Sequence, residues 1–484
     1  MRIGLIAAEA APLAKTGGLG DVTAALARHL AAAGHDARLV LPAYGSLRGE
    51  GLRIAPTSYC RDGEVALGPR RLAFTLASVR LPPDGPEAFL VQCPALYGRP
   101  RIYAQDGDEH LRFAFLAVAA LEGFQRMGFS PDIVHVHDWH AALAPALLAT
   151  RYAWDRQRFG ATRSVLTVHN MAYQGTFPLR LLPEVGLGGA EALVPGFLRE
   201  QGVFSFLGLG LAHADALTAV SRTNALEIQR PEHGFGLDGL VRARAGRLVG
   251  IPNGIDEREW DPAQDGHLAA RYDASDLRGK QACRAALCAE AGLVLPGGVP
   301  LAGLVARLSA QKGFDRVLAA LPPLVAQGRL GLVVLGSGSE AIAARLQALA
   351  ARFPGRVTFW QGFDEARAHR VEAGSDLFLM PSLFEPCGLN QMYSQRYGTP
   401  PVVHRTGGLA DTVEPWDART GRGTGFAFEH PTAAGLSWAL EQALACWADR
   451  EAWLRVQRAG MARDFSWRRQ VQHYVQLYER LHAR

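Results

Sequence analysis

The chain has 484 residues, 48% hydrophobic and 20% charged, which is the composition of a globular protein and excludes a disordered one. Its length favours two domains over a single core. The net charge of +5 comes from scattered basic residues rather than a basic run, so we expect no nucleic-acid partner. Six cysteines without a metal-type CxxC pair, and no apolar stretch of 18 residues, predict a reduced cytoplasmic protein with no membrane contact.

Short apolar runs alternate with longer helical patterns, which indicates βαβ units and parallel sheets. The first half predicts strands near residues 2–7, 37–41, 133–137, 164–169 and 216–220, and helices at 24–33 and 112–125. The second half predicts strands near 301–306, 331–335, 357–361, 377–381 and 401–404, and a helix at 340–353. Residues 466–484 are predicted to form one amphipathic helix, with Ser466 as its N-cap. We therefore expect α/β domains at 1–250 and 251–465, followed by this helix.

One glycine-rich pattern occurs once in each half of the chain. Residues 15–21 and 405–411 share the order basic-Thr-Gly-Gly-Leu-x-Asp, each after a strand-like run and before a helix-like run. Glycine lets backbone N–H groups approach a ligand closely, and a helix N-terminus favours negative charge. Two such loops could hold a pyrophosphate and a sugar, although two short glycine-rich turns can also coincide by chance.

Charged residues follow two of the predicted strands in the second half. Arg307 and Lys312 come directly after residues 301–306, at the strand end where parallel sheets bind ligands. A guanidinium and an ammonium suit a diphosphate leaving group, and two solvated surface cations are the alternative. Glu385, followed by Pro386 and Gly388, is predicted to lie in a held loop rather than on a helix face.

Metal chemistry is not expected from the histidine-rich segment at 135–140. His135 and His137 would point to one face of a strand, as zinc ligands can. The zinc-hydrolase pattern His-x-His-x-Asp-His needs Asp at its fifth position, whereas Asp138 is fourth. A Gly-x-Gly at 336–338 lacks the third glycine of a dinucleotide-binding loop and is interpreted as a turn lining a nucleotide cleft.

Eight segments, in matching order and spacing, together resemble the bacterial glycogen synthase and plant starch synthase family. They are residues 15–22, 137–140, 167–170, 253–256, 307–313, 381–389, 397–399 and 405–411. The resemblance implies two Rossmann-like domains facing across a deep cleft, of the GT-B type, with the last helix crossing back to the first domain. It also implies a retaining hexosyltransferase that moves glucose from ADP-glucose to the non-reducing end of an α-1,4-glucan such as glycogen, without a metal or other cofactor.

The same resemblance implies roles for individual residues. Arg307 and Lys312 would neutralise the departing diphosphate, and Glu385 would lie near the transferred glucose. Two further catalytic residues would hold the glucosyl unit and the acceptor: Asp138 and His169. The donor-binding residues would be Lys15, Gly17, Gly18, Asp21, Asn253, Phe363, Thr406, Gly407 and Gly408.

Several positions depart from the pattern of that family. Phe363 stands where Tyr is frequent, which preserves an adenine stack but removes the hydroxyl. Leu383 and His404 replace arginines, and Glu109 replaces an asparagine, although none removes a proposed charge on the pyrophosphate. Tyr393 breaks the Glu-x7-Glu spacing of a sister group, which favours glycogen and starch synthases.

The expected mechanism follows from the number of candidate catalytic carboxylates in the sequence. Retention normally needs two carboxyl groups about 5 Å apart, but the sequence offers one persuasive carboxylate, Glu385. We therefore expect front-face attack, with the leaving phosphate taking the acceptor proton. The alternatives are a nucleotide-sugar epimerase or another hexosyltransferase on the same fold, a pyridoxal-dependent phosphorylase, and a non-catalytic glucan-binding protein.

Overall fold

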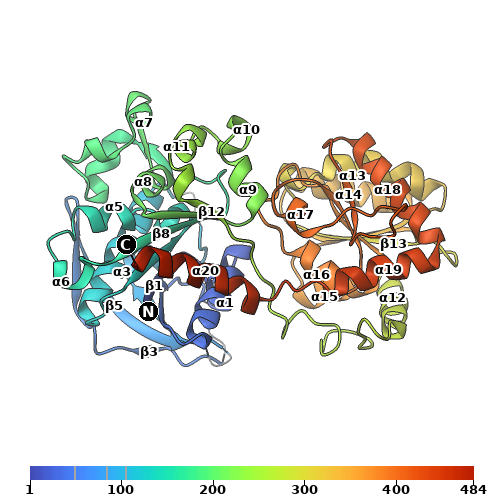
Figure 1. Ribbon diagram of the computed structural model, residues 1–484, viewed down its shortest axis with the longest axis horizontal. Helices are drawn as coiled ribbons and strands as arrows, with labels where there is room; N and C mark the ends of the chain where they lie inside the picture. The colour runs from blue at the N-terminus through green and yellow to red at the C-terminus, as the bar shows by residue number, and fades with distance from the viewer. Residues whose placement is uncertain (48–50, 83–84, 104–105, 484) are drawn as a thin grey trace. The chain divides into compact units, whose positions relative to one another are not determined.

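The structure is a computed structural model that describes residues 1–47, 51–82, 85–103 and 106–483. The chain forms two compact units, Met1–Asn253 with Trp467–Arg484, and Gly254–Ser466. Both are α/β units built on largely parallel sheets (Figure 1). None of the helices in the described ranges is both long and apolar enough to cross a membrane.

The first unit is built on a sheet whose central strands are parallel. Its strand order is β12-β11-β8-β7-β1-β2-β6-β5-β3, with β4 paired to β5. The bounds are β1 (Arg2–Ile6), β2 (Asp36–Pro42), β3 (Ala55–Pro56), β4 (Gly63–Leu67), β5 (Arg70–Arg80), β6 (Glu87–Gln92), β7 (Ile133–His137), β8 (Arg163–Val168), β11 (Ala216–Ala219) and β12 (Leu248–Gly250). A separate antiparallel ribbon joins β9 (Thr176–Pro178) to β10 (Val203–Ser205).

Helices cover the first sheet because its parallel strands are buried on both faces, as Ile133–His137 illustrates by being buried throughout. The larger helices are α1 (Gly18–Ala32), α3 (Glu109–Arg126), α8 (Phe206–His213) and α20 (Trp467–His482). Short helices connect the strands: α2 (Pro94–Tyr97), α4 (Asp138–Ala141), α5 (Ala144–Ala149), α6 (Arg156–Phe159), α7 (Gly196–Glu200), α9 (Arg222–Glu227), α10 (Pro231–Gly234) and α11 (Asp238–Ala243).

The last helix, α20, packs in the first unit. It lies beside α1, as Figure 1 shows in dark red and blue. Its apolar face enters the same core as β1 and α1, with Trp467, Val471 and Tyr474 buried. The hydroxyl of Tyr478 lies 2.7 Å from Nδ1 of His135, so the helix also contacts the polar centre of the first sheet.

The second unit has a six-stranded, fully parallel sheet with the order β15-β14-β13-β16-β17-β18. Its strands are β13 (Leu301–Val305), β14 (Gly331–Gly336), β15 (Val357–Gln361), β16 (Leu377–Met380), β17 (Pro401–His404) and β18 (Phe426–Phe428). Its helices are α12 (Arg278–Ala291), α13 (Phe314–Ala326), α14 (Glu340–Arg352), α15 (Glu365–Gly374), α16 (Asn390–Arg396), α17 (Gly407–Thr412), α18 (Ala433–Ala448) and α19 (Arg450–Met461).

The strands predicted from apolar runs all form, with ends that differ by at most one residue. The first helix differs more, because it begins at Gly18 rather than near residue 24. Gly17 serves as its N-cap and Asp21 lies in its first turn, where a negative charge is favourable. The antiparallel β4–β5–β6 segment was not predicted, since its alternating pattern is short and interrupted by turns.

Candidate active site

The predicted functional residues gather at the carboxyl ends of parallel strands in both units. In the first unit we define the N-unit cluster as Lys15, Gly17, Gly18, Asp21, Asp138, His169 and Asn253, which follow β1, β7, β8 and β12. In the second unit we define the C-unit cluster as Arg307, Lys312, Phe363, Glu385, Thr406, Gly407 and Gly408, which follow β13, β15, β16 and β17. The carboxyl ends of parallel strands are where open α/β sheets bind ligands.

A buried carboxylate that sequence reasoning missed shapes the loop between β1 and α1. Glu9 is 2% exposed, and its carboxylate accepts hydrogen bonds from Thr16 N at 2.5 Å, Thr16 Oγ1 at 2.9 Å and Tyr103 OH at 2.5 Å. These bonds fix the backbone just before α1 begins. The available signal was an acidic residue at the end of the apolar run 3–8, where a buried carboxylate needs polar partners.

The basic and acidic residues of this loop pair with each other. Lys15 Nζ lies 2.8 Å from Asp21 Oδ1, and both side chains remain about one-third exposed. Gly17 has an extended backbone, and a Cβ added there would meet nothing within 4 Å. Space beside a helix N-terminus is what an anionic donor group needs. The donor-binding roles of Lys15, Gly17, Gly18 and Asp21 stay a prediction.

Asp138 is held in an unusual backbone conformation at the end of β7. Its φ is 55°, in the left-handed region, which non-glycine residues seldom adopt and which occurs often at functional sites. Its Oδ1 accepts hydrogen bonds from His169 N at 2.7 Å and Asn170 N at 3.3 Å. Burial raises the pKa of Asp138 to about 7, against the opposing effect of these two bonds. Asp138 and His169 are therefore brought together, whereas the roles that the family resemblance implies for them stay a prediction.

The buried histidines of β7 and the neighbouring His169 are neutral at neutral pH. Burial lowers the pKa of His135 and His169 to about 3 and that of His137 well below its usual value. His137 Nδ1 lies 3.0 Å from His169 Nε2, so one ring donates and the other accepts. His135 contacts the hydroxyls of Tyr478 and Thr167 through its two nitrogens, which leaves neither for a metal ion.

His140 is expected to make the first unit acid-sensitive. Its ring packs against Tyr103, Phe113 and Trp139, and burial lowers its pKa to about 3. A folded pKa below the unfolded value near 6.5 means that the stability contribution is present above pH 6.5 and is lost as the pH falls toward 3. Between pH 7 and pH 5, the free energy of unfolding should therefore fall by about 2 kcal/mol less in His140→Phe than in the wild type.

Urea unfolding of both proteins at the two pH values measures this difference. His233→Phe, at a half-buried position of the same unit, is the matched control and should follow the wild type. Equal pH dependence in His140→Phe and the wild type would contradict the assignment.

An ion pair forms the centre of the C-unit cluster. Lys312 Nζ lies 2.6 Å from Glu385 Oε2, which also accepts a hydrogen bond from Ser382 Oγ at 2.9 Å. The Glu385 side chain is 8% exposed and that of Lys312 is 20% exposed. Gly313 follows Lys312 with φ 73°, and a Cβ there would overlap the carbonyl oxygen of Pro381. The glycine thus lets the lysine's loop approach the strand end that leads to Glu385.

Arg307 is exposed and makes no ion pair within the described ranges. Phe363 is also exposed, with 70% of its surface accessible, in the loop between β15 and α15. An accessible aromatic ring on a loop can stack on a base, and the adenine stack that the family resemblance implies stays a prediction. Asn253 in the first unit is buried, and its Oδ1 has no hydrogen-bond partner among the atoms described.

The second glycine pair closely contacts the loop that carries Glu385. Gly407 has φ 45°, and an added Cβ would overlap the carbonyl oxygen of Glu385. An added Cβ at Gly408 would overlap that of Cys387. Gly408 N donates to Glu385 O at 3.0 Å, and Thr406 N donates to His404 O at 2.9 Å.

The backbone amides of Thr406 and Gly408, both predicted to bind phosphate, therefore donate to protein oxygens in this structure. Their phosphate-binding role stays a prediction. The two glycine patterns that match in sequence also differ in structure, since the Gly17 backbone is extended and its Cβ position is open.

Alanine substitutions in the two glycine loops should have different effects on thermal stability. Gly407→Ala should lower the thermal midpoint by several degrees, because the new Cβ strains a left-handed residue and displaces the Glu385 loop. Gly17→Ala should leave the midpoint within about one degree, since its conformation is open to any residue. Differential scanning fluorimetry of both variants tests the contrast, and equal midpoints would refute it.

Sequence and structural comparisons agree on the class of protein. Residues 2–243 match the family described as starch synthase catalytic domain, and residues 290–458 match glycosyl transferases group 1. A glycogen synthase of Anaeromyxobacter dehalogenans (strain 2CP-C) is 48% identical over 99% of this chain and 100% of its own length. One of Koribacter versatilis (strain Ellin345) is 41% identical over 99% of this chain and 98% of its own.

A solved structure extends the match to three dimensions. The catalytic domain of starch synthase IV from Arabidopsis thaliana, bound to ADP and acarbose, has a TM-score of 0.93 and 32% identity. The match covers 100% of this chain and 99% of the other. The chain belongs to the glycogen synthase and starch synthase family, whose members are glucosyltransferases. The predicted family and the GT-B fold of two α/β domains with parallel sheets are both confirmed.

Proposed function

We propose that the chain transfers glucose from ADP-glucose to the non-reducing end of an α-1,4-glucan, with retention of configuration and without a catalytic metal ion. The observation that carries this proposal is similarity to glycogen synthases along the whole chain, at 48% identity in one relative. The related starch synthase that was solved with ADP and acarbose supports a nucleotide donor and a glucan-like acceptor.

The C-unit cluster is proposed to stabilise the leaving group. Negative charge grows on the diphosphate as the glycosidic bond breaks, and fixed cations at that point lower the barrier. Arg307 offers an exposed guanidinium, and Lys312 offers an ammonium whose position is fixed by Glu385. Holding the lysine in place before the reaction avoids the cost of reorganising it during charge transfer.

The N-unit cluster is proposed to hold the sugar and the acceptor. His169 is neutral, so it offers a hydrogen bond without placing a positive charge beside an oxocarbenium-like centre. Asp138 fixes the backbone at His169 and can carry a proton or a negative charge near neutral pH, since its pKa is about 7. Lys15, Gly17 and Gly18 are proposed to contact the donor.

Front-face attack is proposed in preference to a covalent intermediate. Glu385 Oε2 already accepts from Lys312 Nζ and Ser382 Oγ, which suits an orienting carboxylate better than a nucleophile. The acceptor hydroxyl then loses its proton to the departing phosphate. Mass spectrometry of protein quenched during turnover with a slow donor analogue tests this step, and a glucosyl adduct on Glu385 would overturn it.

A coupled assay of nucleotide release tests the overall reaction. With glycogen present, ADP-glucose should yield ADP in step with glucan elongation, and UDP-glucose should react much more slowly. Conversion of ADP-glucose to an isomeric ADP-sugar without ADP release would favour an epimerase, and phosphate-dependent glucose 1-phosphate formation would favour a phosphorylase. Glucan binding without any ADP release would indicate a binding protein. Turnover should persist in EDTA if no metal ion takes part in catalysis.

The chain is proposed to act in a reducing compartment, the cytoplasm. All six cysteines are free thiols, and five of them are buried. A large protein without disulfides is typical of such a compartment. ADP-glucose and glucan are the proposed substrates, with neither a nucleic acid nor a membrane as a partner.

A further inference from the structure

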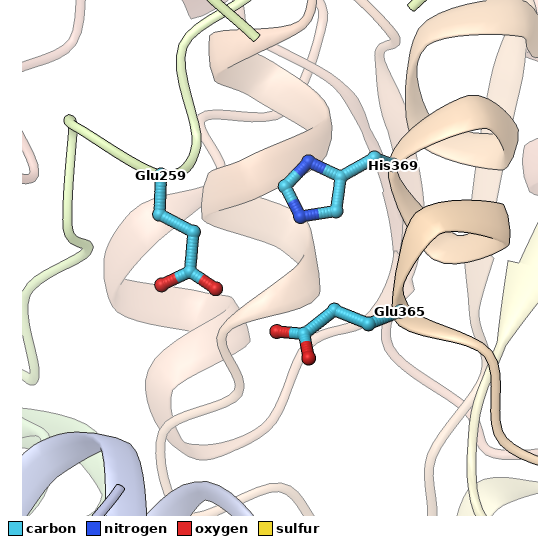
Figure 2. Close-up of side chains that lie close together, drawn as sticks. All are labelled: Glu259, Glu365 and His369. Carbon is cyan, nitrogen blue, oxygen red and sulfur yellow. The ribbon is translucent and has the colours of Figure 1, made fainter. Parts of the chain in front are cut away.

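Three side chains of the second unit converge outside the C-unit cluster. They are Glu259, Glu365 and His369, whose ligand atoms all lie within 4.8 Å of one another (Figure 2). Glu365 begins α15, and His369 lies one turn later on the same helix, so the two side chains share one face. Glu259 comes from the segment that precedes α12. Of the residues described, only these three form such a group.

His369 is the buried member of this group. Its side chain is 1% exposed, and its Nε2 has no hydrogen-bond partner in the described structure. In Figure 2 the ring edge that carries this nitrogen faces the carboxylates of Glu259 and Glu365. A buried polar atom without a partner costs free energy, unless a group absent from the protein chain satisfies it.

The opposite nitrogen of the ring is firmly occupied. His369 Nδ1 lies 2.8 Å from Asp265 Oδ2, which also accepts a hydrogen bond from Tyr397 OH at 2.6 Å. An aspartate in this position accepts a hydrogen bond from Nδ1–H and so leaves a lone pair on Nε2, directed at the two glutamates. The indole of Trp260 stacks on the ring at 3.8 Å and fixes its plane.

We propose that Glu259, Glu365 and His369 bind one divalent transition-metal ion of the zinc class. Imidazole nitrogen and carboxylate oxygen are both ligands of such an ion, and water would be the fourth ligand. Asp265 then serves as the outer carboxylate that orients a metal-bound histidine. Ligands on one tetrahedral ion lie about 3.4 Å apart, so the flexible glutamates need to close by about 1 Å.

Such an ion would brace the second unit without taking part in glucosyl transfer. It would tie the segment around Glu259 and Asp265 to the first turn of α15. Phe363 lies two residues before that helix, so the same ion would steady the loop that presents this exposed ring. The proposal is independent of the donor and of the reaction, and it is tested without an activity assay.

Metal binding by the full-length chain provides the test. Protein dialysed against a chelator and then against buffer is titrated with ZnCl₂ by calorimetry, and separately with CoCl₂ by visible absorption. We expect one equivalent of Zn²⁺ to bind and a Co²⁺ spectrum without the intense thiolate charge-transfer band that a cysteine site would give. Glu365→Gln and Glu259→Gln should each weaken Zn²⁺ binding at least tenfold.

The control variant is Glu451→Gln, at an exposed position of the same unit in the first turn of α19. It should bind Zn²⁺ as the wild type does. Asp265→Asn should weaken binding about 10- to 100-fold although it touches no ion. Circular dichroism confirms that each variant is folded. No stoichiometric uptake by the wild type, or uptake that is unchanged in both glutamate variants, would overturn the proposal.

Discussion

Arg307→Ala should lower kcat by about 10²- to 10³-fold while leaving the free energy of unfolding unchanged. The guanidinium is exposed and forms no ion pair with the residues described, so its removal breaks no structural contact of that kind. Its proposed partner is the diphosphate, on which charge grows only as the bond to glucose breaks. The loss should therefore appear in kcat more than in KM for ADP-glucose.

Steady-state rates of ADP release and urea unfolding together measure the effect. Arg345→Ala is the matched control, because Arg345 is an exposed arginine on α14 of the same unit. It should retain the wild-type kcat. A kcat within twofold of the wild type in Arg307→Ala would show that this arginine does not assist the leaving group.

Lys312→Ala should lose at least as much turnover and should also destabilise the second unit. Its ammonium is proposed to contact the diphosphate, and it also neutralises the buried carboxylate of Glu385. Removing one partner of a buried ion pair leaves an uncompensated charge and costs about 3 kcal/mol. Two different measurements, kcat and the free energy of unfolding, are thus expected to fall together.

A double variant separates the two effects of Lys312. In Lys312→Ala/Glu385→Gln the neutral amide needs no cation, so most of the lost unfolding free energy should return. Turnover should stay low, because the cation at the leaving group is still missing. Arg329→Ala, which breaks the exposed pair with Glu441, is the control and should change stability by less than about 1 kcal/mol. Recovery of turnover in the double variant would refute a direct role for Lys312.

Most of the sheet strands and the residues at their ends could be predicted from the sequence. Buried parallel strands leave a strong local signal, since each is a short, continuous apolar run. The carboxyl ends of such strands meet at one edge of a sheet, so Asp138 and His169 could be expected to lie together before the structure placed them 2.7 Å apart, from Oδ1 to the backbone N. Family resemblance then added the reaction, which no single motif determines.

Pairings between distant residues could not be read from local patterns. Glu9 contacts Tyr103, and His135 contacts Tyr478, across 94 and 343 residues of chain. Neither partner stands out in sequence, because each contact depends on how helices and loops pack on the sheet. The same limitation concealed the group of Glu259, Glu365 and His369, because Glu259 lies more than a hundred residues before the other two.

The sequence by itself determined most of the parallel strands, the family, and which charged and glycine residues follow those strands. Only the tertiary structure decided what those residues contact. Lys312 holds Glu385, and Gly407 fits against the same loop, whereas Gly17 in the matching sequence pattern is open. The physical reason is that hydrophobic periodicity is a local property, while burial and hydrogen-bond pairing depend on groups that only folding brings together.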